Sequence, residues 1–304
     1  MSAASPVADI PPVASPVAEP PFKQGLQVGF FSGRGGVGKS TVALMTAFAA
    51  QRRGLRVALV DLDLQFGDLK YLAGKEPAAC VQQFSLAQLC ECLELPSIPH
   101  ESLALVLAPD APEQGERFAS TLPVLLTKLA LQRDLVVINT GSFWTDVHAR
   151  VAQQCDQLVF LMDQRATSIE ACKQAVDLCL RLHVPQMRFR YLLNGCGRHA
   201  ALMPMDVSLA LGGVEVCALA DGGTLVDELL ALGCPLELLE SKNAFVASLE
   251  DFLDTLMGQR LKEFSAARDE GGRAEAQRGT RRSAKLLNFP LLRTLFEGAR
   301  RVTP

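Results

Sequence analysis

A glycine-rich run at residues 33–41, GRGGVGKST, carries the strongest chemical signal in the sequence. It satisfies the spacing Gly-x-x-x-x-Gly-Lys-Ser of a phosphate-binding loop. Glycines let successive backbone N–H groups turn toward phosphate oxygens, and the helix that follows adds the partial positive charge of its N-terminus. Lys39 is expected to reach the β- and γ-phosphates, and Ser40 to bind Mg²⁺. The run therefore predicts a nucleoside-triphosphate site made by Gly33, Gly35, Gly36, Val37, Gly38, Lys39, Ser40 and Thr41.

Two carboxylates, Asp61 and Asp63, stand at the end of the next apolar run along the chain. Reactive groups gather where the strands of a parallel sheet end. One carboxylate there can hold a water of the Mg²⁺ shell, and the other can orient the water that attacks the γ-phosphate. A strand-end turn stabilised by its own Asp side chains would explain the same two residues. These two carboxylates alone therefore do not establish whether the site hydrolyses a nucleotide.

Asn139 stands where a phosphate-hydrolysing site is expected to have an aspartate. It ends the apolar run 135–138, and a carboxylate at this point would anchor the water shell of the metal. An amide keeps an acceptor oxygen but adds no negative charge, so Mg²⁺ binding should weaken, and Asp61 could compensate in part. Two outcomes stay open: slow hydrolysis, or nucleotide binding without hydrolysis.

The elements that must position these groups alternate between strand and helix, which predicts an α/β fold with a doubly wound, mostly parallel sheet. Apolar runs predict strands at 26–31, 56–61, 103–108, 135–138, 157–162, 188–193 and 214–219. Helical spacing predicts helices at 42–51, 144–154, 168–182, 223–231 and 243–257. Ser168 is expected to cap the third of these helices, and residues 109–112 to form a loop.

Composition sets the broad class of the protein. The 304 residues are 49% apolar and carry a net charge of −3, which argues against general coating of nucleic acid. Nine cysteines without a Cys-x-x-Cys pair favour reduced, buried thiols in the cytoplasm. No run of about 18 apolar residues predicts a membrane span, and no signal peptide is recognised at the start. A cytoplasmic nucleotide-binding domain at 23–260 is therefore expected.

The two ends of the chain differ from this domain. Residues 1–22 are rich in Pro and Ala and predict a disordered segment. Residues 260–304 hold 11 Lys and Arg against 5 Asp and Glu. We expect 261–304 to form a flexible basic linker, at 264–283, and a short amphipathic tail. The tail, whose main helix is limited to about 291–301 by Pro290, could lie on an anionic inner-membrane surface, dock into a partner's groove or pack on its own domain.

The loop at 33–41 resembles the deviant form found in the MinD/ParA family, and the resemblance covers roughly residues 26–258. Arg34 occupies the place of the signature lysine of that family. The resemblance implies a P-loop NTPase of the SIMIBI class that binds ATP and Mg²⁺ and closes as an ATP-dependent homodimer. Arg34 would then reach across to the partner's phosphates, a contact that a planar guanidinium can make with two oxygens at once. A solvated arginine at the loop edge is the alternative.

A finer resemblance links the stretch 61–69, DLDLQFGDL, and residues 107–113 to the Flp pilus-localisation proteins TadZ and CpaE. It implies that Asp61 serves the Mg²⁺ shell and that Asp63 positions the attacking water, with Lys39 and Arg34 as the other catalytic groups. In those proteins a receiver-like domain usually precedes the ATPase, and residues 1–22 are expected to stand in its place here. Asn194 resembles the asparagine that contacts the adenine edge in this family, although Asn-Gly is also a turn dipeptide.

Three functions are consistent with these features. The first is an ATP-dependent dimerising localisation factor for a Flp/Tad pilus or related secretion machine, with weak or slow ATPase activity. Its partners would be pilus or secretion assembly proteins, and its place the cell pole or the inner-membrane face. The second is a MinD- or FlhG-like membrane-associated regulator of division site or flagellar number. The third is a nucleotide-binding adaptor without turnover. Specific nucleic-acid binding ranks below all three, because only the tail offers phosphate-binding charge.

Overall fold

The computed structural model describes residues 24–74, 76–77, 79–96, 98–99, 101–197 and 200–258. In this part of the chain, eight strands form one sheet in the order β3-β4-β2-β5-β1-β6-β7-β8, and every neighbouring pair is parallel. The strands are β1 (Leu26–Phe31), β2 (Val57–Leu62), β3 (Val81–Ser85), β4 (Leu103–Leu107), β5 (Leu135–Thr140), β6 (Gln157–Asp163), β7 (Phe189–Cys196) and β8 (Val216–Ala220). The predicted doubly wound α/β fold is thereby confirmed.

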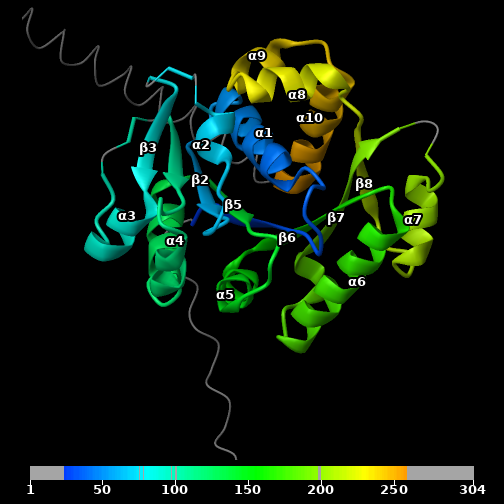
Figure 1. The fold of residues 1–304 in the computed structure, drawn as a ribbon, viewed down its shortest axis with the longest axis horizontal. Helices are drawn as coiled ribbons and strands as arrows, with labels where there is room; N and C mark the ends of the chain where they lie inside the picture. The colour runs from blue at the N-terminus through cyan, green and yellow to red at the C-terminus, as the bar shows by residue number, and fades with distance from the viewer. Residues whose placement is uncertain are drawn as a thin grey trace, which may run out of the picture.

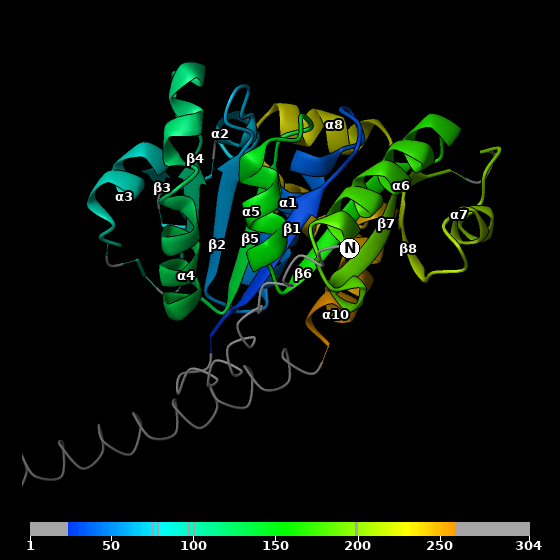
Figure 2. The ribbon, with the colours of Figure 1, turned by 90° about the horizontal axis from the view of Figure 1, so that it is seen from below.

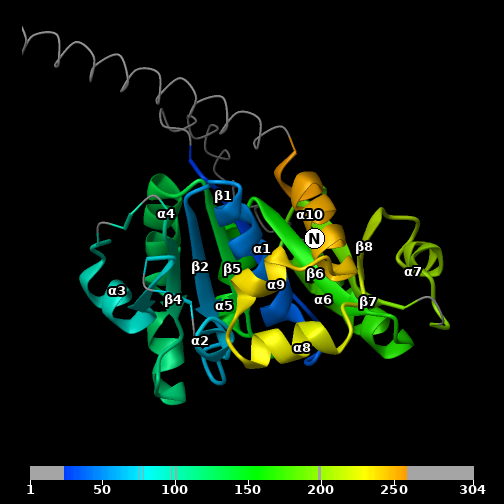
Figure 3. The same ribbon diagram turned by 90° about the horizontal axis from the view of Figure 1, so that it is seen from above.

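Helices cover both faces of the sheet (Figure 1). One layer, seen in front in Figure 3, contains α1 (Lys39–Arg52), α2 (Leu69–Leu72), α8 (Thr224–Ala231), α9 (Pro235–Glu240) and α10 (Ala244–Met257). The other layer, seen in front in Figure 2, contains α3 (Leu86–Cys92), α4 (Leu122–Gln132), α5 (Asp146–Gln154), α6 (Ala166–Arg181) and α7 (Pro204–Ala210). Two short 3₁₀ helices, Pro112–Phe118 and Gln186–Arg188, lie in connections.

The apolar runs of the sequence are strands because both faces of the sheet are buried. Successive side chains of a strand point to opposite faces. In β2, Val57 and Leu59 belong to the core beneath α1, whereas Ala58 and Val60 belong to the core on the other side. A parallel sheet covered on both faces therefore needs continuous apolar strands rather than alternating ones.

The helix predicted at 168–182 begins earlier than expected, and Ser168 as its cap is wrong. α6 starts at Ala166 with Arg165 at the cap position. Ser168 is buried, and its Oγ accepts a hydrogen bond from the Asp163 N–H at 3.2 Å. The hydroxyl therefore fixes the turn between β6 and α6 instead of capping the helix. The helix after the glycine loop also begins earlier, at Lys39, because the left-handed turn ends at Gly38.

Several elements lack a counterpart in the sequence predictions. β3, with the sequence VQQFS, is an edge strand that buries few of its side chains, so its polar residues hid the strand pattern. α4 is a leucine-rich helix, and α2, α7 and α9 are short helices of four, seven and six residues. The expected loop at 109–112 ends where the first 3₁₀ helix begins at Pro112. The expected disordered start, the linker at 264–283 and the tail helix at 291–301 lie outside the described residues.

All nine cysteines are free in the structure. Among the described residues, no helix combines the length and hydropathy needed to cross a membrane.

Candidate functional site

The glycine-rich loop links β1, in the middle of the sheet, to α1. Gly36 and Gly38 have φ values of 71° and 83°, in the left-handed region that favours glycine. A Cβ at Gly38 would lie 2.4 Å from Nδ2 of Asn194, whereas a Cβ at Gly36 would meet nothing within 4 Å. The loop is thus packed against β7 on one side and open on the other.

An open cavity with a volume of about 210 Å³ lies over the loop. Most of the residues predicted for the phosphate site line it, and Asp68 and Ser142 join them. The lining residues are Arg34, Gly36, Val37, Gly38, Lys39, Ser40, Thr41, Asp63, Asp68 and Ser142. The structure therefore brings residues from the loop, the end of β2 and the end of β5 around one space. Asp61 and Asn194 are not in this lining but contact residues of the loop or its neighbours.

The Lys39 side chain is buried beneath this cavity. Its Nζ donates to the Thr140 carbonyl oxygen and, at 3.4 Å, to Oδ1 of Asn139. Burial lowers the pKa of Lys39, and the nearby carboxylates, Asp63 first, oppose that shift. The ammonium is thus held at the end of β5, close to the groups that would share a bound phosphate with it.

Asn139 joins three of the predicted site residues. It is fully buried, and the strand register places it between Phe30 of β1 and Asp61 of β2. Its Nδ2 donates to Oδ1 of Asp61 at 3.1 Å and to Oγ of Ser40 at 3.4 Å, while its Oδ1 accepts from Lys39. A carboxylate at this position could not donate to Asp61 and would place two like charges side by side.

Asp61 is almost completely buried at the end of β2. Burial raises the pKa of Asp61 to about 7, and hydrogen bonds from the Asp63 N–H and the Asn139 amide oppose the shift. Its Oδ1 and the Ser40 hydroxyl both contact the Asn139 amide nitrogen, so the two oxygens neighbour the same amide group. Oxygen donors and a buried carboxylate fit Mg²⁺, although Asn139 contributes no charge.

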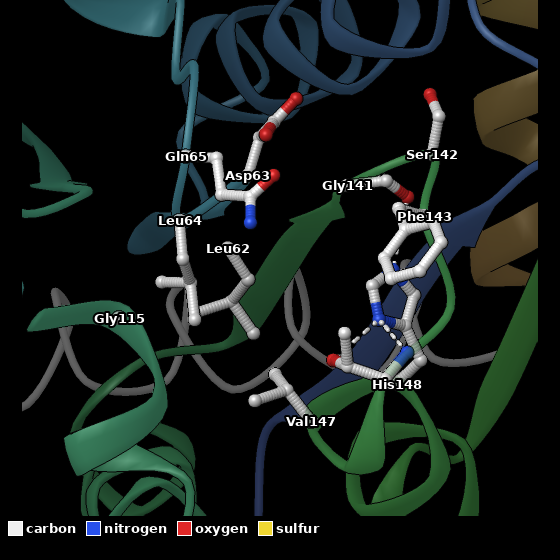
Figure 4. Close-up of a pocket in the computed structure, with 11 residues that line it drawn as sticks. Leu62, Asp63, Leu64, Gln65, Gly115, Gly141, Ser142, Phe143, Val147 and His148 are labelled. Carbon is white, nitrogen blue, oxygen red and sulfur yellow. Dashed lines mark hydrogen bonds between the residues drawn. The ribbon is translucent and has the colours of Figure 1, made fainter. Parts of the chain in front are cut away.

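Asp63 lies at the wall between the cavity over the loop and a second cavity. Its Oδ1 accepts from the Phe66 N–H at 3.3 Å, which orders the turn after β2. Figure 4 shows Asp63 and Gln65 on one wall of the second cavity and Gly141, Phe143 and His148 on the opposite wall. A carboxylate at this junction can orient a water approaching the loop, which is the role expected from the sequence.

His148 fixes the loop that follows β5. Its Nε2 donates to the Gly141 carbonyl oxygen at 2.9 Å, because its Nδ1 accepts from the Thr145 N–H at 3.2 Å. Burial lowers the pKa of His148, which favours this neutral form. Trp144 packs on the imidazole with its ring tilted by 31°, and it donates through Nε1 to the Ser32 carbonyl oxygen at 3.1 Å. The loop after β5 is therefore tied to the start of the phosphate-binding loop.

Arg34, which belongs to the loop, and Asn194, on β7, connect the loop to its neighbours. Nη1 of Arg34 donates to the Thr167 hydroxyl, in the first turn of α6. Nδ2 of Asn194 donates to the Val37 carbonyl oxygen at 2.9 Å. Both residues therefore shape the loop in addition to any contact with a ligand.

Sequence reasoning missed Asp68, Ser142, His148 and Thr167. Asp68 lies in the stretch 61–69 that carries the finer resemblance, and its acidic side chain at the edge of the cavity was a usable signal. No local pattern marks the other three, because only the fold brings the β5–α5 connection and the start of α6 to the loop.

Comparison with protein families gives one match. The CobQ/CobB/MinD/ParA nucleotide binding domain matches residues 28–278. No curated protein sequence matches the chain significantly.

Solved structures with the same fold include relatives of low sequence identity. The ParA family ATPase from Chlorobium tepidum has a TM-score of 0.65 at 22% identity, over 75% of this chain and 98% of that one. MinD from Pyrococcus horikoshii, complexed with Mg-ADP, has a TM-score of 0.64 at 17% identity, and the match covers 77% of this chain and 97% of that one. The MinC:MinD complex of Aquifex aeolicus has a TM-score of 0.60 at 20% identity, and the match covers 77% of this chain and 96% of that one. At these identities the likeness establishes the fold.

Proposed function

The chain belongs to the CobQ/CobB/MinD/ParA nucleotide-binding domain family, and on that premise we propose that it is an ATP-dependent switch. ATP with Mg²⁺ would bind over the loop and stabilise a homodimer, and loss of the γ-phosphate would release it. The ATP-binding domain in this proposal comprises residues 23–260.

One observation carries the proposal: the loop, Lys39, Ser40 and Asp63 line one cavity at the carboxyl ends of the central strands, and the buried Asp61 is connected to Ser40 through the Asn139 amide. The open side of Gly36 gives phosphate oxygens access to the backbone N–H groups. Lys39 would exchange its contacts with the end of β5 for the β- and γ-phosphates. Asn194, held on the loop beside Gly38, would present its amide to adenine.

Mg²⁺, when bound, would neutralise charge on the phosphate oxygens. Ser40 and Asp61 would hold it, and Asp63 would orient the attacking water. Asn139 supplies an amide where a charged anchor is expected, so we propose weak or slow turnover. If the amide of Asn139 prevents turnover completely, the protein would be an adaptor that binds the nucleotide without hydrolysing it.

The cellular role follows from the finer resemblance. The stretch 61–69 and the presence of Arg34 support a localisation factor for a Flp/Tad pilus or related secretion machine, acting at the cell pole or the inner-membrane face. A MinD- or FlhG-like regulator is the alternative, and it too would depend on protein partners, as the MinC:MinD complex of Aquifex aeolicus illustrates for that protein. Residues 261–304 would provide the partner or membrane contact.

Calorimetry of ATP binding tests the core of the proposal. Lys39→Ala should weaken ATP affinity at least 100-fold, because it removes the buried ammonium that faces the β- and γ-phosphates. Lys173→Ala, at a half-buried lysine on α6 that pairs with Glu170 and lies outside the cavity lining, is the matched control and should leave the affinity unchanged. Equal ATP affinity in the wild type and Lys39→Ala would refute the phosphate-loop assignment. Light scattering with and without ATP tests the dimer.

A further inference from the structure

We propose that Thr167 is a positioning residue that aims the Arg34 guanidinium at the partner's phosphates in the ATP-bound dimer. The inference rests on the proposed function, because it concerns the same nucleotide site. Nothing in the sequence pattern points to Thr167, which lies more than a hundred residues beyond the loop and reaches it only through the fold.

The contact between the two side chains leaves the arginine charge uncompensated. Nη1 of Arg34 donates to the Thr167 hydroxyl, which is neutral. No ion pair among the described residues includes Arg34, and its side chain lines the nucleotide cavity. A carboxylate in place of Thr167 would fix the guanidinium but also neutralise it. The hydroxyl instead orients the group while leaving its charge available for phosphate.

The start of α6 is a rigid base for this contact. A Cβ at Gly33 would lie 2.2 Å from the Ala171 carbonyl oxygen, so the loop and the helix touch through their backbones. The turn before the helix is fixed by Asp163, which donates through its N–H to the Ser168 hydroxyl and accepts from the Arg165 N–H at 3.1 Å. Thr167 therefore has a defined position relative to the loop.

Arg165, the other arginine of this region, is not available for the same task. Its guanidinium is paired with the Asp163 carboxylate, which already balances its charge. Of these two arginines, only Arg34 can offer an uncompensated charge to a phosphate at this face.

The arrangement also gives a reason for arginine at position 34, where the family signature is lysine. A guanidinium has five N–H donors spread over a plane, whereas an ammonium is a compact point charge. Arg34 can keep one donor on Thr167 and present the remaining edge to phosphate oxygens in a two-pronged contact. A lysine would have to divide a single nitrogen between the hydroxyl and the phosphate.

A double-mutant cycle on ATP-dependent dimerisation of the full chain tests the inference. Thr167→Val removes the hydroxyl at nearly constant shape, and Thr167→Ser retains it. In the wild-type background with MgATP, Thr167→Val should raise the dimer dissociation constant about three- to tenfold, measured by analytical ultracentrifugation. Thr167→Ser should stay within about twofold of the wild type. In the Arg34→Ala background, Thr167→Val should cause no further change, because the residue acts only through Arg34.

Control measurements separate a positioning role from a structural one. The ATP affinity of dilute Thr167→Val monomer should match that of the wild type, which shows that the variant is folded and binds nucleotide. Dimerisation of Thr167→Val equal to that of the wild type would overturn the inference alone. The inference would also be overturned if Thr167→Val weakened the dimer equally in the wild-type and Arg34→Ala backgrounds, or if Thr167→Val made the dimer tighter. A wild-type protein that does not dimerise with ATP would overturn the proposed function and this inference with it.

Discussion

At the scale of single residues, Asn139 connects the polar groups that we propose for binding a cation and phosphates. Its amide donates to Asp61 and Ser40 and accepts from Lys39, so in the structure it satisfies the polar groups that a cation and phosphates would otherwise bind. An amide can do this because it both donates and accepts. The asparagine that replaces the expected aspartate therefore makes specific contacts that an aspartate could not all make.

Asn139→Asp should raise Mg²⁺ affinity and ATP turnover about tenfold or more, because a second carboxylate attracts the hydrated cation. In the absence of Mg²⁺, the same variant should be less stable by about 1–3 kcal/mol, since the new carboxylate faces Asp61 without a donor between them. Chemical unfolding with and without Mg²⁺, together with phosphate release, measures both effects. Asp63→Ala should remove the turnover of either protein and spare ATP binding. A wild type that hydrolyses ATP rapidly and does not respond to Asn139→Asp would contradict the proposed role.

The second prediction at this scale concerns pH. The pKa of Asp61 is about 7 in the folded protein against 3.8 for the ordinary carboxyl. The folded state therefore holds the proton more tightly than the unfolded state does. The contribution of Asp61 to the free energy of unfolding should be fully present below about pH 4 and lost as the pH rises through about 7.

Urea unfolding from pH 4 to 8 without Mg²⁺ measures this dependence. Asp61→Asn should flatten it, and Asp254→Asn, at an exposed position on α10, should leave it unchanged. Mg²⁺ added at pH 7.5 should restore stability to the wild type and not to Asp61→Asn. Identical pH profiles for the wild type and Asp61→Asn would show that burial of this carboxylate has no energetic consequence.

At the scale of elements, the connection from β1 to α1 depends on backbone that only glycine adopts easily. Gly38→Ala should destabilise the protein by about 1–3 kcal/mol, because φ is 83° there. It should also abolish ATP binding, since a Cβ would lie 2.4 Å from the Asn194 amide nitrogen and displace the loop from β7. Gly197→Ala is the control, because a Cβ at Gly197 meets nothing within 4 Å. Thermal unfolding and calorimetry distinguish the two variants.

The loop, its lysine and Asp61 could be predicted from the sequence because each depends on a short stretch of chain. Glycine spacing, an apolar strand before it and a helix after it are local properties. The contacts of Asn139 could not be predicted, because they require β5 to lie between β1 and β2 in a particular register. The contact between Arg34 and Thr167 likewise depends on how α6 packs against the loop.

The same contrast between local sequence patterns and tertiary contacts explains which strands and helices could be predicted from the sequence. Central strands are continuous apolar runs, so their positions were predicted within a few residues. β3 is an edge strand with two glutamines, and its signal was too weak. Ser168 was a reasonable cap by residue type, but the turn after β6 takes its hydroxyl for the Asp163 N–H. In this turn, a contact with Asp163 thus overrides the preference of Ser168 for a helix cap position.

At the scale of the whole molecule, two of the regions that expose large apolar side chains bear on assembly. Phe66, Tyr71 and Phe143 are at least 76% exposed; Phe66 lies in the connection after β2, Tyr71 on α2, and Phe143 in the connection after β5, where it lines the second cavity. Met205 and Leu209 are 70% and 67% exposed on α7, beside the sheet edge formed by β8 (Figure 1). Exposed aromatic side chains grouped at one place indicate contact with a partner. In the proposed switch, the aromatic group around the cavity would be covered when ATP joins two copies.

Phe143→Ser should therefore weaken ATP-dependent dimerisation about tenfold or more, because truncation of a central aromatic anchor typically costs at least about 1–2 kcal/mol of binding free energy. The stability of the monomer should change by less than about 0.5 kcal/mol, since the ring is 76% exposed. Met205→Ser on α7 removes a comparably exposed apolar side chain at the other region and should leave dimerisation unchanged. Sedimentation of the two variants with MgATP makes the comparison directly. Loss of dimer in Met205→Ser with retention in Phe143→Ser would place the interface at the β8 edge, where the nucleotide could not be shared between subunits and Arg34 could not act across the dimer.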